Sequence, residues 1–140
     1  MPTERPHPTP AELAILRVLW RRGKSTVRDV QAELNAGRAE DSAAGYTTVL
    51  KLMQIMTDKG LVRRDESQRT HVYQASASEE HTQGRLVRDL LDRAFGGSAQ
   101  KLVLQALSAK RASPEEIAQI RSLLDEMEKS EAGKERGEPS

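Results

Sequence analysis

Apolar residues recur every three or four positions in three segments near the start of the chain, which is the spacing of amphipathic helices. We expect these helices to cover residues 10–22, 27–34 and 47–59. Thr9 and Thr26 precede the first two helices, and each has an acidic residue three positions later, so each start is a predicted capping box. The third helix should turn four residues inward, namely Val49, Leu52, Met53 and Met56.

Two strand-like segments follow the third helix. Residues 61–65 and 70–75 carry β-branched and aromatic residues, and the polar turn Glu66-Ser67-Gln68-Arg69 separates them. The order helix, helix, helix, strand, turn, strand is that of a helix-turn-helix with a wing. We therefore predict that residues 9–75 form a winged helix-turn-helix domain, and that the chain as a whole is mainly α-helical.

From residue 76 onward the pattern indicates helices alone, over residues 79–95, around 102–107 and from Pro114 onward. A domain of residues 78–128 is too small to bury three amphipathic helices well by itself, and oligomerisation is a common remedy. We predict that this helical domain holds two subunits together. The expected subunit contacts are Leu90, Leu91, Phe95, Leu102, Leu104, Leu107, Ile117, Ile120, Leu124 and Met127.

Composition excludes several classes of site. Without cysteine, and with three histidines that lack metal-ligand spacing, we expect no disulfide, metal site or cofactor. No nucleophile–base spacing or phosphate-cradling glycine loop is present, so an enzyme is not expected. No apolar run approaches membrane-spanning length and no secretion signal is visible, so a cytoplasmic protein is expected. Residues 1–8 and 130–140 are polar and are expected to be flexible tails.

Charge is distributed unevenly along the chain. Residues 1–75 carry 12 Lys and Arg against 9 Asp and Glu, whereas residues 76–140 carry 10 against 12. A basic first half followed by an acidic second half suits a DNA-binding domain joined to an assembly domain. Small polar residues at a helix start can reach base edges, and basic residues of a wing can reach phosphates. The candidate DNA contacts are Tyr46, Thr47, Thr48, Lys51, Thr26, Arg63, Arg64 and Arg69.

Five short motifs together carry a resemblance to a known family. They are Thr9-Pro10-Ala11-Glu12 with Leu19-Trp20, Thr26-Val27-Arg28-Asp29-Val30, Tyr46-Thr47-Thr48-Val49, Asp58-Lys59-Gly60-Leu61, and Arg69 with Tyr73. From Thr9 to about Met127 the chain resembles the penicillinase-repressor family, the BlaI and MecI type.

The resemblance implies a homodimeric transcriptional repressor that binds a palindromic DNA operator with TACA/TGTA cores. It also implies a membrane sensor-protease as a partner, because cleavage in the dimerisation domain releases many members from DNA. This chain differs from the family at three places. Gln68 stands where the wing usually has glycine, Ile55 where many members have arginine, and Gln105-Ala106 at the cleavage position.

Two other readings of the same pattern stay open. A winged helix can serve as a protein-interaction adaptor, and a winged-helix regulator can respond to a small ligand without proteolysis. Low aromatic content disfavours an apolar ligand pocket. Binding to a TACA/TGTA palindrome in rising salt would distinguish a repressor from an adaptor.

Overall fold

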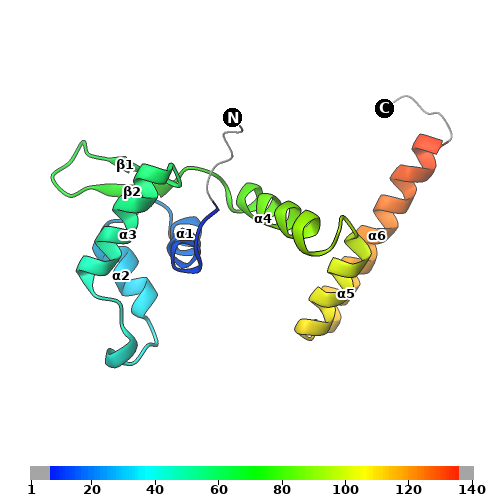
Figure 1. Cartoon of the computed structure of the whole chain (residues 1–140), viewed down its shortest axis with the longest axis horizontal. Helices are drawn as coiled ribbons and strands as arrows, with labels where there is room; N and C mark the ends of the chain where they lie inside the picture. The colour runs from blue at the N-terminus through cyan, green and yellow to red at the C-terminus, as the bar shows by residue number, and fades with distance from the viewer. Residues whose placement is uncertain (1–6, 136–140) are drawn as a thin grey trace. The chain divides into compact units, whose positions relative to one another are not determined.

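The computed structural model describes residues 7–135, and within them the chain is mainly helical, as predicted. The elements are α1 (Pro10–Arg22), α2 (Val27–Asn35), η1 (Glu40–Ser42), α3 (Tyr46–Lys59), β1 (Val62–Asp65), β2 (Val72–Ala75), α4 (Glu79–Ala94), α5 (Ala99–Ala109) and α6 (Pro114–Glu135). Figure 1 shows the winged helix-turn-helix formed by α1–α3 with the β1–β2 hairpin. The chain divides into two compact units between Asp89 and Leu90, inside α4.

Both predicted capping boxes are present. At the start of α1 the Thr9 N–H donates to Glu12 Oε1 over 2.8 Å, and the Glu12 N–H donates to Thr9 Oγ1 over 3.2 Å. At the start of α2 the same exchange joins Thr26 and Asp29, over 3.0 and 3.1 Å. Each box satisfies two backbone N–H groups that have no partner within the helix, and thereby sets where the helix begins.

Helix α3 begins at Tyr46, one residue earlier than expected, after Gly45 as N-cap. The loop before it is held by the Asn35 side chain, which accepts from the Ala44 N–H over 2.8 Å and donates to the Ala44 carbonyl over 2.9 Å. The helix ends at Gly60, whose φ of 81° lies in the left-handed region that glycine enters without strain.

The wing is an antiparallel hairpin in which Val62 lies opposite Ala75. Both strands are shorter than predicted, because the Leu61 N–H donates to Met56 at the end of α3 and residues 66–71 form a longer connection than the expected four-residue turn. Ser25 extends the hairpin on its other edge. Its N–H and carbonyl exchange hydrogen bonds of 3.0 and 2.8 Å with Tyr73.

One apolar core holds the winged helix together. The inward residues of α3 lie there, as predicted, although Leu52 is only half-buried, and they meet Tyr73 and the apolar stripe of α1. Burial of this apolar surface is the main stabilising term of the domain. The buried apolar residues are Ile15, Leu16, Val18, Leu19, Val27, Val30, Val49, Met53, Met56, Val62 and Tyr73.

The three rear helices contribute nothing to a buried core within the described residues. Helix α5 begins at Ala99, because the Ser98 hydroxyl accepts from the Lys101 N–H over 3.2 Å. Helix α6 continues to Glu135, so the expected flexible tail from residue 130 is wrong for residues 130–135. That segment is rich in Glu, Lys and Ala, which favour helix even without an apolar face.

Residues 1–6 and 136–140, which include part of each predicted tail, lie outside the described residues. His7, the first described residue, places its Nε2 3.7 Å from Asp89 Oδ1. Within residues 7–135, no helix combines the length and apolar character that a membrane span requires.

Candidate nucleic-acid interface

Helix α3 has two chemically different sides. Thr47, Thr48 and Lys51 are exposed, whereas Val49 and Met53 on the opposite side are fully buried against the core. Helical periodicity predicts this division, because residues three and four apart share a side. The structure therefore brings the predicted base-facing residues of α3 together on one accessible polar surface.

Helix α3 is also pinned to α1 by a buried ion pair that the sequence did not reveal. Lys59 Nζ lies 2.9 Å from Glu12 Oε2 and 3.0 Å from Oε1, and the Glu12 side chain is only 2% exposed. Burial by itself raises the pKa of this carboxyl, but hydrogen bonds from Thr9 and the Lys59 charge outweigh it and lower the pKa overall. The charged pair fixes the end of α3 against the start of α1.

A second contact lies at the other end of α3. The Arg28 guanidinium of α2 sits over the Tyr46 ring, 5.0 Å from its centroid, in a cation–π arrangement. Arg28 was not among the candidates predicted from the sequence. The signal available in the sequence was its place two residues after Thr26, within the motif Thr26-Val27-Arg28-Asp29-Val30 at the start of α2.

These residues line an open groove of about 370 Å³ between α2, α3 and the wing. Thr26 and Arg28 come from α2 and Tyr46 from α3, and the wing connection supplies Arg69 and His71. The remaining lining residues are Val27, Leu50, Thr70 and Tyr73, so none of the described residues around the groove is acidic. Three of the predicted contacts, Thr26, Tyr46 and Arg69, thus share one concave surface.

The three predicted wing arginines have different surroundings. Arg64 Nη2 lies 2.6 Å from Glu66 Oε1, and Arg63 Nη2 donates to the Ser76 carbonyl over 3.4 Å. Arg69 is exposed and has neither an ion pair nor a hydrogen bond within the described part of the chain. Of the three, only Arg64 is ion-paired, and Arg69 is the one without any polar partner within the described residues.

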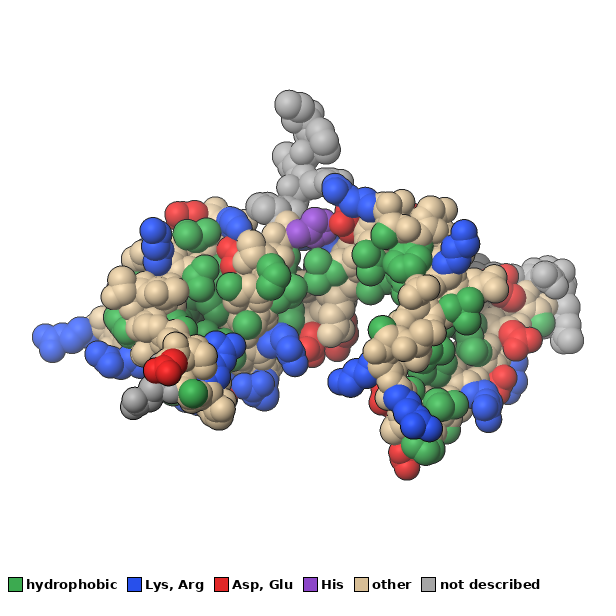
Figure 2. Space-filling model, turned by 60° about the horizontal axis from the view of Figure 1, so that its bottom comes forward, with side chains coloured by type: hydrophobic (Ala, Val, Ile, Leu, Met, Phe, Trp, Pro, Cys, Tyr) green, Lys and Arg blue, Asp and Glu red, His purple; other side chains and the backbone are tan. Residues whose placement is uncertain are grey.

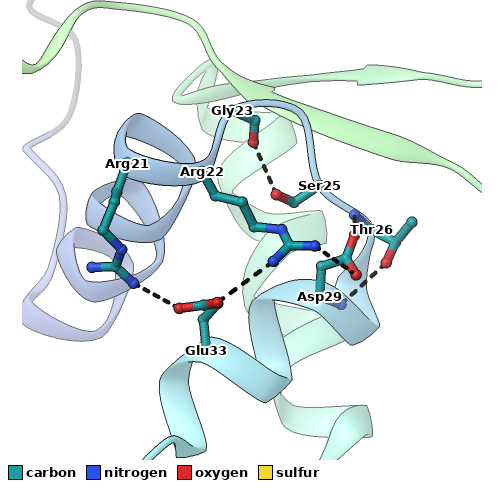
Figure 3. A network of polar contacts seen from close by, with 7 residues as sticks. All are labelled: Arg21, Arg22, Gly23, Ser25, Thr26, Asp29 and Glu33. Carbon is teal, nitrogen blue, oxygen red and sulfur yellow. Dashed lines mark hydrogen bonds and ion pairs between the residues drawn. The ribbon is translucent and has the colours of Figure 1, made fainter.

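Two other arginines are neutralised within the domain. Figure 3 shows Arg21 and Arg22 at the end of α1 turned toward carboxylates of α2. Arg21 Nη2 lies 2.9 Å from Glu33 Oε2, and Arg22 lies 3.3 Å from Asp29 and 3.5 Å from Glu33. The Thr26 backbone hydrogen bond and the Arg22 charge lower the pKa of Asp29, which keeps it ionised. This network joins α1 to α2 and leaves little free charge there.

The predicted subunit-contact residues have a different character. Figure 2 shows apolar side chains gathered over the surface of α5 and α6. Leu104 is 56% exposed and Met127 57% exposed, and Leu90, Leu107, Ile117 and Leu124 are exposed as well. The other predicted contacts are half-buried, namely Leu91, Phe95, Leu102 and Ile120.

Comparison with known proteins agrees with this geometry. The model of one family, the penicillinase repressors, matches residues 8–126. The chain belongs to the penicillinase repressor family. A penicillinase repressor of Staphylococcus aureus is 18% identical over 119 residues, covering 85% of this chain and 91% of the relative. A penicillinase repressor of Bacillus licheniformis is 25% identical over 121 residues, covering 86% and 91%.

Family membership confirms the resemblance expected from the sequence motifs and identifies the coarse function as transcriptional repression. Both relatives are regulators by name rather than enzymes. The winged helix with its exposed α3 surface is the candidate DNA-binding part of this penicillinase repressor family member.

Proposed function

We propose that the protein represses transcription by binding a palindromic DNA operator as a homodimer. The observation that carries this proposal is the α3 surface, where Thr47, Thr48 and Lys51 are exposed while the opposite side of the helix is buried. A helix exposed on one side only, with short polar side chains near its N-terminus, fits the major groove. The repressor would act on DNA in the cytoplasm.

Each side chain has a distinct role in this proposal. Thr47 and Thr48 offer hydroxyls to bases or phosphates and methyl groups to thymine, and Lys51, one turn further, reaches a guanine edge. The wing and the starts of α2 and α3 hold the phosphate backbone. The proposed backbone contacts are Tyr46, Thr26, Arg63, Arg64 and Arg69.

The rear helices supply the second half of the mechanism. These helices form no buried core within the described residues and leave large apolar side chains exposed. A second copy of the chain would cover these side chains. Two winged helices on one dimer bind two half-sites, so the tether raises the effective concentration of the second domain. Separation of the subunits would then release DNA without a change in any base contact.

The route of release is proposed as disruption of this dimerisation domain. Cleavage after a membrane sensor-protease signal would fall at Gln105-Ala106, which lies inside α5 with both side chains exposed. A helical backbone must open locally before a protease can cut it. This placement favours a release step that begins with unfolding of α5, with or without cleavage.

The test is binding of a fluorescent TACA/TGTA palindrome, compared with a scrambled duplex, between about 50 and 200 mM salt. We expect tighter binding to the palindrome and a steep fall of affinity with salt. The variant Thr48→Ala/Lys51→Ala should lose about 100-fold in preference for the palindrome, because each lost base contact weakens discrimination by about 1–3 kcal/mol.

Lys101→Ala, which removes an exposed lysine of α5, is the matched control and should bind like the unchanged protein. Equal, weak binding to both duplexes by the unchanged protein would support the adaptor reading instead. A normal preference in the double variant would show that α3 does not read the operator.

A further inference from the structure

We propose that Arg28, stacked on Tyr46, forms with Arg69 a clamp for one phosphate of the DNA backbone in each half-site. The clamp occupies the groove between α2, α3 and the wing. This inference rests on the proposed function and adds a positioning contact, Arg28, that the sequence motifs did not assign.

The groove is chemically suited to an anion. Two arginines from separate elements line it, Arg28 from α2 and Arg69 from the wing connection, together with His71. None of its described lining residues is acidic, so no carboxylate of the groove competes for these cations. The Tyr46 and Thr26 side chains complete the lining with hydroxyl groups, which can donate to phosphate oxygens.

Arg28 is also available for a ligand, unlike the arginines just before it. Arg21 and Arg22 are paired with Glu33 and Asp29, whereas Arg28 is exposed and its one interaction within the described residues is with the Tyr46 ring. Stacking on a ring limits the rotamers of the guanidinium while leaving its N–H groups free. The side chain is thus held in place before DNA arrives.

The position favours a phosphate over a base edge. Arg28 belongs to α2, and in helix-turn-helix proteins the helix before the base-reading helix crosses the DNA backbone. A planar guanidinium binds phosphate oxygens in pairs, and such contacts fix register without reading sequence. Arg28 and Arg69 would therefore bind the backbone of the DNA strand that borders the major groove occupied by α3.

The measurement is the dependence of DNA affinity on salt for Arg28→Gln. Each lost phosphate contact should reduce the log–log salt slope by about 0.9, hence by about 1.8 for a dimer on two half-sites. Palindromic and scrambled duplexes should lose affinity by the same factor. Arg17→Gln is the matched control, because Arg17 is an exposed arginine of α1 outside the groove, and its slope should not change.

Tyr46 variants test the stack. Tyr46→Leu should bind a duplex with two half-sites about tenfold more weakly than Tyr46→Phe does, because only phenylalanine keeps a ring under Arg28. In the Arg28→Gln background this difference should disappear. Equal affinities of the two Tyr46 variants with Arg28 present would overturn the stacking part of the proposal.

Neutral methylphosphonate linkages locate the clamp. When the phosphate that the clamp binds is replaced, at one position in each half-site, the unchanged protein and Arg28→Gln should bind the modified duplex with equal affinity. An unchanged salt slope in Arg28→Gln, or a loss confined to the palindrome, would reject a phosphate clamp. A protein that fails to bind any duplex would instead reject the proposed function, so the two failures are distinguishable.

Discussion

At the scale of single residues, Glu12 connects local and long-range structure. Its carboxylate closes the capping box of α1 and, at the same time, receives the ammonium group of Lys59 from the end of α3. Because these hydrogen bonds and the Lys59 charge lower the pKa of Glu12, the carboxylate is ionised at neutral pH and its burial is compensated. This ion pair therefore adds to the apolar core in fixing the orientation of the proposed DNA-reading helix.

Lys59→Met should lower the free energy of unfolding by about 2 kcal/mol at neutral pH, because a buried carboxylate loses its partner. The Glu12 pKa is lowered by folding, so its contribution is present above the ordinary value of 4.5 and is lost as the pH falls through the folded-state pKa. The stability gap between the two proteins should therefore narrow below pH 4.5.

Urea unfolding followed by circular dichroism at several pH values measures this gap. Lys51→Met is the control, because Lys51 is an exposed lysine of the same helix without an ion pair within the described residues, and it should change stability by less than about 0.5 kcal/mol. A gap that stays constant down to pH 3 would mean that the Glu12 charge is not what Lys59 compensates.

At the scale of elements, the end of α3 decides where the wing begins. The Gly60 N–H donates to the Thr57 carbonyl over 3.1 Å, and the Leu61 N–H donates to Met56 over 2.9 Å. This arrangement requires the left-handed backbone at Gly60 and turns the chain directly into β1 at Val62. The proposed DNA-reading helix and the wing beside it are thus joined by one glycine-dependent turn.

Gly60→Ala should destabilise the winged helix by about 1–2 kcal/mol, because an alanine backbone is strained at a left-handed φ. A steric clash is not the cause, since open space surrounds the new Cβ. Gly84→Ala, in the interior of α4, should instead stabilise its helix by about 0.5–1 kcal/mol. Its Cβ would meet only Arg88, at an ordinary 3.9 Å. Thermal unfolding of both variants checks the opposite signs, and equal effects would contradict the role of backbone conformation.

At the scale of the whole molecule, the winged helix and the three rear helices differ in how they reach stability. The winged helix has a buried apolar core, whereas α4, α5 and α6 leave large apolar side chains accessible in the single chain. An exposed apolar surface of this kind is costly in water unless another surface covers it. This contrast is the physical basis for proposing that the rear helices join two subunits.

Leu124→Glu should therefore shift the protein from dimer to monomer in analytical ultracentrifugation at micromolar concentration. Leu124 is 54% exposed in the single chain, so the new charge leaves the fold intact and acts on the association. Operator affinity should fall by about 100-fold or more, because the second winged helix is no longer tethered. Ser122 lies on the opposite side of α6, so the control variant Ser122→Glu should remain dimeric. If Leu124→Glu is also dimeric, the face of α6 that carries Leu124 is not the interface.

The elements and their order follow from the amino-acid sequence alone. Thr9 and Thr26 begin helices through hydrogen bonds to residues three positions away, and Gly60 ends one through its own backbone freedom. The inward side of α3 follows from helical periodicity alone. Such signals are legible because the free energies behind them arise within a few residues of chain.

Which charged side chains are paired within the protein and which remain available to a ligand depends on tertiary packing. Lys59 reaches a carboxylate 47 residues away, Arg21 and Arg22 are neutralised by α2, and Arg28 stacks on Tyr46. None of these pairings has a sequence signature, because each depends on how packed helices cross and on distances set by the core. The sequence around an arginine or lysine does not show whether a carboxylate lies near it in the fold. Its availability to DNA is fixed by the neighbours that folding brings to it.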